Sequence, residues 1–131
     1  MVWYLDTSAF LKLLVLEDES PALRAWCVAH DSLWSSHLLR TEALRAATRL
    51  GVDRAVVDEA VATVSLILPS TSTYVNAGLA EPSSIRSLDA LHLASALELG
   101  EDLEGIVAYD DRLIEAARRN SVRVVTPGRS E

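Results

Sequence analysis

Short apolar runs alternate with helical patterns along this chain, and this alternation restricts its fold more than any other feature. The runs are rich in β-branched and aromatic residues, and most are followed by a segment with apolar residues at helical spacing. Parallel strands need crossover helices between them, whereas antiparallel strands can be joined by tight turns. The alternation therefore predicts an α/β domain with a largely parallel sheet.

The ends of the expected elements follow from local signals. Ser or Thr before an apolar helix, Pro at the first helical position and Gly after the last turn mark helix ends. Thr7 and Ser8 are read as cap residues of the first helix on this basis. The expected strands are 2–5, 32–35, 65–68, 105–109 and 122–125, and the expected helices are 9–16, 20–30, 36–50, one from about 53, 73–80, 88–99 and 110–120.

Size and composition limit the class of protein. The 131 residues predict one domain over 1–131. No apolar run is long enough to span a bilayer, and Cys27 alone provides neither a disulfide framework nor a thiolate metal site, so we expect a cytoplasmic protein. A net charge of −7 argues against nucleic-acid binding mainly through a basic surface, but not against an enzyme that reaches phosphates through metal ions.

Two acidic residues directly follow expected strands. Asp6 lies where the first strand passes into a helix, and Asp110 follows the apolar run GIVAY. In parallel α/β sheets, binding sites form outside the carboxyl ends of the strands. This shared position makes Asp6 and Asp110 candidate site residues.

Two further acids occupy positions that a solvated charge normally avoids. Glu42 lies three residues after Leu39 and four before Ala46, on the core-facing stripe expected for its helix. Asp89 lies in the first turn of a largely apolar helix, where the helix dipole favours an anion by up to about 1 kcal/mol. The stripe comprises Leu39, Ala43, Ala46 and Leu50.

Each acid also has a purely structural explanation. Asp6 could cap a helix, and Glu42 could form an ion pair with Arg45 or Arg86. Asp89 could be favoured by the helix dipole, and Asp110 could be a turn residue. Four such charges together in a dry interior are costly unless a cation neutralises them. Hard cations such as Mg²⁺ and Mn²⁺ prefer oxygen ligands, and the sequence offers no His-rich or Cys-rich set suited to zinc.

Four segments resemble the PIN domain and, within it, the VapC-type ribonuclease toxins of bacterial toxin–antitoxin pairs. They are YLDTSAFLKL, the acid-containing LLRTEALRA, RSLDALHLASAL and VAYDDRLIEAA, in the order found in the family. The resemblance implies a three-layer α/β/α sandwich, cleavage of RNA with Mg²⁺ or Mn²⁺, a homodimer, and a VapB-type antitoxin that threads into the active-site groove. It makes Asp6, Glu42, Asp89 and Asp110 the catalytic acids.

The resemblance also suggests a division of roles. Asp6 and Asp89 would bind the metal directly, and Glu42 and Asp110 would complete the site directly or through water, with Asp110 counted among the metal ligands. The metal would polarise the scissile phosphate and generate a hydroxide for in-line attack. Residues beside these motifs that could assist are Thr7, Ser8, Arg86, Asp111 and Arg112.

One departure from the family pattern leaves an alternative open. Ala108 stands where the fourth motif commonly has Thr or Ser, so a hydroxyl that could orient a water is missing. The alternative is therefore a PIN-like module without catalysis that binds nucleic acid or serves as a scaffold. His92, three residues after Asp89, is interpreted as a packed or hydrogen-bonded helix residue rather than a ligand or base.

A haloacid-dehalogenase phosphatase, a response-regulator receiver and a dinucleotide-binding domain all fit less well. The phosphatase needs a second Asp at the position of Ser8, and the receiver needs a late Lys, whereas the only Lys is Lys12. The dinucleotide-binding domain needs a Gly-rich turn after the first strand, and DTSAF contains no Gly.

Overall fold

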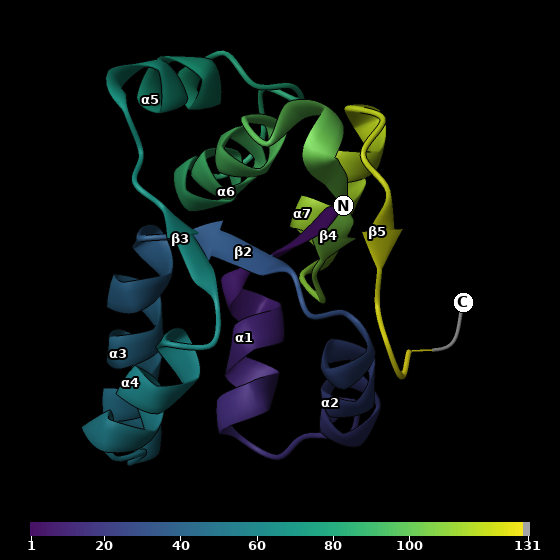
Figure 1. The fold of residues 1–131 in the computed structure, drawn as a ribbon. Coiled ribbons are helices and arrows are strands. Elements are labelled where there is room, and N and C mark those ends of the chain that lie inside the picture. The colour runs from purple at the N-terminus through teal and green to yellow at the C-terminus, as the bar shows by residue number, and fades with distance from the viewer. Residues whose placement is uncertain (130–131) are drawn as a thin grey trace.

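A parallel five-stranded sheet lies between two layers of helices in the computed structural model, which describes residues 1–129 (Figure 1). Its strands are β1 (Val2–Leu5), β2 (Leu33–Ser36), β3 (Ser65–Ile67), β4 (Leu103–Val107) and β5 (Val124–Val125). They are ordered β3-β2-β1-β4-β5, and every neighbouring pair is parallel. The α/β class and the three-layer sandwich expected from the sequence are confirmed.

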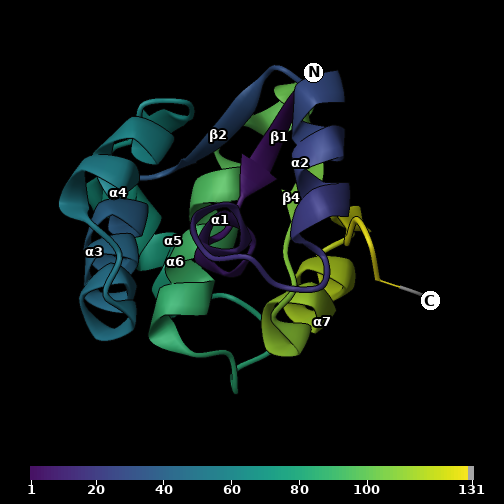
Figure 2. The ribbon, with the colours of Figure 1, turned by 90° about the horizontal axis from the view of Figure 1, so that it is seen from below.

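The helices divide between the two faces of the sheet. Figures 1 and 2 show α1 to α4 on one face, with α1 between α2 and the α3–α4 pair, and α5 to α7 on the other. Within residues 1–129, no helix is long and apolar enough to cross a membrane. The helices are α1 (Thr7–Leu14), α2 (Ser20–Ala29), α3 (Leu38–Leu50), α4 (Arg54–Val61), α5 (Thr71–Gly78), α6 (Ser87–Leu97) and α7 (Asp111–Arg119), and a 3₁₀ turn, η1 (Gly100–Asp102), precedes β4.

Side chains of the central strands alternate between the two helical layers. In β1, Trp3 and Leu5 pack in the cluster that contains Phe10 of α1, whereas Tyr4 points to the opposite face and packs with Leu93 of α6. Successive side chains of a strand point to opposite faces, so a strand covered on both sides is apolar throughout. This explains why Val2 to Leu5 has no polar alternation.

The core stripe expected on α3 is wrong at one position. Leu39, Ala43 and Ala46 are buried as expected, but Leu50 is 58% exposed and Ala47 is buried instead. Leu50 is the last residue of the helix, which ends at Gly51 in the left-handed conformation. Side chains in this final turn extend past the edge of the core, which the helical period alone does not show.

Helix α5 begins at Thr71, two residues before its expected start, because Ser70 and Thr73 form a capping box. The Ser70 hydroxyl accepts a hydrogen bond from the Thr73 amide, and the Thr73 hydroxyl accepts one from the Ser70 amide. We expect Ser70→Ala to lower the free energy of unfolding by about 1 kcal/mol, because the Thr73 amide loses its side-chain acceptor. Denaturant unfolding would measure it, with the exposed Ser72→Ala as control; equal effects of the two changes would contradict the cap.

The strand order creates a switch point beside β1. The chain runs from β1 outward through β2 to β3 and then returns to place β4 on the other side of β1. Connections on the two sides of such a point diverge, which leaves a crevice at the carboxyl ends of the two strands. Asp6 follows β1 directly, and Asp110 lies three residues beyond the end of β4.

Candidate active site

Asp6 is a buried carboxylate that caps helix α1. It is 3% exposed, and its Oδ1 accepts a hydrogen bond of 2.9 Å from the amide of Ala9. The Ser8 hydroxyl lies 2.7 Å from Oδ1 and 2.8 Å from Oδ2 and donates to this carboxylate. The expectation that Thr7 and Ser8 cap this helix is therefore wrong: Asp6 is the N-cap, and Thr7 is already helical.

The environment of Asp6 opposes its negative charge. Burial raises the pKa of Asp6 to about 6, and the neighbouring Asp110 carboxylate adds to the increase. Hydrogen bonds from Ala9 and Ser8 and the charge of His92 act in the opposite direction without cancelling it. A carboxylate in this position is stabilised by a cation.

Asp89 and Asp110 lie at the N-termini of two other helices. Asp89 is in the first turn of α6, and partial burial together with Asp110 raises its pKa. Asp110 is the N-cap of α7, and its Oδ1 accepts from the amides of Arg112 at 2.9 Å and Leu113 at 3.1 Å. The positive ends of three helices are thus directed toward the same group of aspartates.

Glu42 reaches this region from α3 and is held by two donors. Its Oε1 lies 2.6 Å from His92 Nε2 and accepts a hydrogen bond of 2.8 Å from the Thr7 hydroxyl. Burial would raise the pKa of Glu42, but these hydrogen bonds and the charge of His92 outweigh it and lower the pKa below its ordinary value. The ion pair with Arg45 or Arg86 that could have explained Glu42 is wrong, because its partner is His92.

His92 connects Glu42 to the interior of the sheet. It is 2% exposed, and its Nδ1 lies 2.7 Å from the Tyr4 hydroxyl. Burial raises the pKa of Tyr4 above its usual range, so its phenol keeps its proton beside Nδ1, while Nε2 faces Glu42. The interpretation of His92 as a hydrogen-bonded helix residue is confirmed, and we call Tyr4, His92, Glu42 and Thr7 the Tyr4–Glu42 chain.

The four acids are close enough to affect one another but are not in a closed cluster. Asp110 raises the pKa of both Asp6 and Asp89, and Glu42 contributes to the increase at Asp89. Across residues 1–129, no three His, Cys, Asp or Glu side chains are gathered tightly enough to hold a metal ion. The acids therefore face a common region, and Asp6, Glu42 and Asp110 are each held there by their own hydrogen bonds.

The remaining sequence candidates lie in three places: Thr7 and Ser8 beside the acids, Asp111 exposed at the surface, and Arg86 and Arg112 in the lining of a separate pocket. Thr7 and Ser8 contact the acids directly, and the Ser8 hydroxyl also accepts a 2.9 Å hydrogen bond from the Tyr109 amide, next to Asp110. The Asp111 side chain is 92% exposed and pairs with Arg129 at 3.1 Å. Ala108 is fully buried among the apolar side chains of α6 and α7, so this position provides packing and no hydroxyl.

Comparison with known proteins connects this arrangement to one family. Residues 3–119 match the PIN domain. Ribonuclease VapC46 of Mycobacterium tuberculosis is 39% identical over 125 residues, covering 95% of this chain and 96% of its own length. Ribonuclease VapC35 of the same organism is 38% identical over 138 residues, covering 97% and 98%.

A solved structure agrees in fold. The crystal structure of VapC20 from Mycobacterium tuberculosis superposes with a TM-score of 0.70 at 18% identity, covering 87% of this chain and 94% of that one. The family match spans most of the chain, and the relatives cover nearly all of it. This chain therefore belongs to the PIN-domain family and, within that family, to the VapC proteins.

Proposed function

We propose that this VapC protein, as a single domain over residues 1–131, is a Mg²⁺-dependent endoribonuclease and the toxin of a toxin–antitoxin pair. Its catalytic acids are Asp6, Glu42, Asp89 and Asp110. The observation that carries the proposal is the convergence of these acids at the switch point between β1 and β4. Full-length similarity to proteins named ribonucleases supports RNA as the substrate.

The donor set fits a hard divalent cation. All four acids offer carboxylate oxygens, and mutual repulsion together with burial raises the pKa of Asp6 and Asp89. Mg²⁺ and Mn²⁺ bind such oxygens and remove this penalty. Asp6, Asp89 and Asp110 would hold the metal, and Glu42 would complete the site directly or through water.

The residues of the site have distinct tasks in phosphodiester hydrolysis. When bound, the cation supplies Lewis acidity to the scissile phosphate and to a water. Glu42, kept ionised by His92 and Thr7, orients the attacking water or receives its proton at its carboxylate. Ser8 holds the Asp6 carboxylate in one orientation, so this group does not have to reorganise during the reaction.

The proposal includes a cognate VapB-type antitoxin, a homodimer and a cytoplasmic location. Exposed apolar side chains on α5 and directly after it support a protein–protein contact. Tyr74 and Val75 are each more than half exposed, and Leu79 is 75% exposed. Large apolar side chains gathered on one surface segment are typical of interaction sites.

Metal removal is the direct test of the proposal. We expect the purified, antitoxin-free protein to cleave a panel of tRNA, rRNA and mRNA with Mg²⁺ or Mn²⁺ and to lose this activity in EDTA, because the acids alone cannot activate water at neutral pH. Asp89→Asn, prepared in the same way, controls for contaminating nucleases. Cleavage that persists in this variant would contradict the site assignment. RNA binding without cleavage of any substrate would favour the non-catalytic module.

A further inference from the structure

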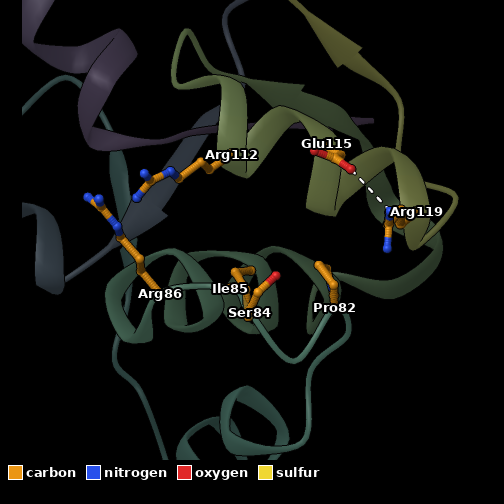
Figure 3. Close-up of a pocket in the computed structure, with 7 residues that line it drawn as sticks. All are labelled: Pro82, Ser84, Ile85, Arg86, Arg112, Glu115 and Arg119. Atoms are coloured by element: carbon orange, nitrogen blue, oxygen red, sulfur yellow. Dashed lines mark ion pairs between the residues drawn. The ribbon is translucent and has the colours of Figure 1, made fainter.

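A groove lies beside the acidic site, between α7 and the loop that leads into α6 (Figure 3). Its volume is about 440 Å³, which is within the range of sites that hold small ligands or parts of larger ones. None of the four acids lines it. Its lining residues are Pro82, Ser84, Ile85, Arg86, Arg112, Glu115 and Arg119.

The two ends of the groove differ in charge. At one end, Arg119 forms an ion pair of 3.2 Å with Glu115. At the other end, the Arg86 and Arg112 side chains extend toward each other, and neither forms a hydrogen bond or an ion pair with the part of the chain that the structure describes. Two guanidinium groups thus face one space without a direct partner among the described residues, in a protein whose net charge is −7, although Arg86 is near enough to Asp89 for its charge to lower the pKa of that carboxyl.

The positions of these arginines on their helices increase the local positive potential. Arg86 is the N-cap of α6 and makes no side-chain cap hydrogen bond, and Arg112 is in the first turn of α7. Helix N-termini carry partial positive charge, so a cation there is unfavourable, whereas an anion is stabilised. A bound anion would relieve both the repulsion between the arginines and their conflict with the helix ends.

We propose that this groove, the Arg86–Arg112 groove, binds a backbone phosphate of RNA next to the phosphate that is cleaved. The proposal rests on the ribonuclease function. Arg86 lies three residues before Asp89, and Arg112 lies two after Asp110, so the groove adjoins the acidic site. Guanidinium groups bind phosphate oxygens in a bidentate manner, and this local positive site offsets the repulsion of RNA by an acidic protein.

Equilibrium binding without catalysis tests the groove directly. The probe is a short fluorescein-labelled single-stranded RNA in EDTA, where no cleavage occurs, and the variants are Arg86→Gln and Arg112→Gln. Arg49→Gln is the matched control, because Arg49 is an exposed arginine in the last turn of α3. We expect each groove variant to bind roughly tenfold more weakly and to reduce the slope of log affinity against log salt concentration by about 0.7.

Cleavage kinetics separate a binding role from a role in the chemistry. With Mg²⁺ present, the groove variants should raise KM while kcat changes little, because the bound phosphate lies outside the reacting group. Groove variants that match Arg49→Gln in affinity and salt slope would overturn the proposal even if wild-type protein cleaves RNA. A wild type without measurable RNA affinity would also overturn it.

Two further outcomes distinguish RNA binding in the groove from antitoxin binding there and from the proposed ribonuclease function. Groove variants that bind RNA normally but lose antitoxin binding would overturn it in favour of an acidic protein segment. Weakened RNA binding in the groove variants of a wild type that cleaves no RNA would support the groove and refute the ribonuclease function. Failure of the two proposals is therefore distinguishable.

Discussion

Asp6→Asn is expected to abolish RNA cleavage while the protein remains folded. Asp6 is the most buried of the four acids and lies directly at the end of β1. Water has little access to this position and therefore cannot take over the role of the lost carboxylate. Loss of a carboxylate proposed to hold the metal should reduce kcat/KM by roughly a thousandfold or more, which corresponds to about 4 kcal/mol of transition-state stabilisation. Cleavage of RNA in Mg²⁺ measures this effect.

The fold should tolerate this change because asparagine can make the same local contacts. An Asn side-chain oxygen can accept from the Ala9 amide, and Asn is as good an N-cap as Asp. Its amide group can donate to the Ser8 hydroxyl, which otherwise donates to the carboxylate. The variant also avoids burying a charge, so its metal-free form should be at least as stable as wild type at neutral pH.

The pH dependence of stability provides an independent signature of Asp6. In the metal-free wild type, burial raises the pKa of Asp6 from 3.8 to about 6, so the folded state binds this proton more tightly than the unfolded state. The free energy of unfolding should therefore fall as pH rises through this interval, by a few kcal/mol from this group. The Asp6→Asn variant should lack that decrease.

Denaturant unfolding in EDTA across this pH interval measures the difference. Asp18→Asn is the control, because Asp18 is exposed in the loop between α1 and α2. The control should keep the wild-type pH dependence and the wild-type cleavage rate. An Asp6→Asn variant that cleaves RNA normally, or that follows the wild-type stability curve, would contradict the role of this buried charge.

His92→Leu should weaken both catalysis and stability. The change removes the hydrogen-bond partner at Glu42 Oε1 and the one at the Tyr4 hydroxyl. A buried hydroxyl without a partner costs about 1–3 kcal/mol of folding free energy. Because the partners of metal ligands typically affect affinity or activity by 10–100-fold, we expect a decrease in kcat/KM of roughly that size.

Tyr4→Phe is the matched variant for the far end of the Tyr4–Glu42 chain. It leaves the His92–Glu42 hydrogen bond in place, so its effect on catalysis should be smaller than that of His92→Leu. The distinguishing measurement is the Mg²⁺ concentration needed for half-maximal cleavage, which should rise in His92→Leu. If His92→Leu is less stable but shows unchanged Mg²⁺ dependence and activity per folded molecule, His92 has only a structural role.

The architecture and the candidate acids could be predicted because they depend on short-range patterns. The continuous apolar run of β1 reflects burial on both faces, and helix signals near Ser20, Gly51 and Asp53 fall within a residue or two of the observed ends. Asp6 and Asp110 could be located because strand ends in a parallel sheet meet at one edge.

The Tyr4–Glu42 chain could not be predicted because its contacts join distant segments. Tyr4 and His92 are 88 residues apart, and His92 and Glu42 are 50 apart. Which side chain meets Glu42 depends on how α3 and α6 pack against β1, and sequence spacing contains no such information. Pairing of opposite charges close in sequence suggested an arginine as the partner of Glu42. Arg45, however, lies on the exposed side of α3.

Helix α6 carries parts of all three functional regions in successive turns. Arg86 at its N-cap lines the groove, Asp89 belongs to the acidic site, and His92 belongs to the Tyr4–Glu42 chain. Residues three apart on a helix are neighbours along its surface. One inserted or deleted residue within α6 would rotate everything beyond it by about 100° and separate these groups at once. Length variation among relatives should therefore be confined to the loops, while α6 diverges by substitution only.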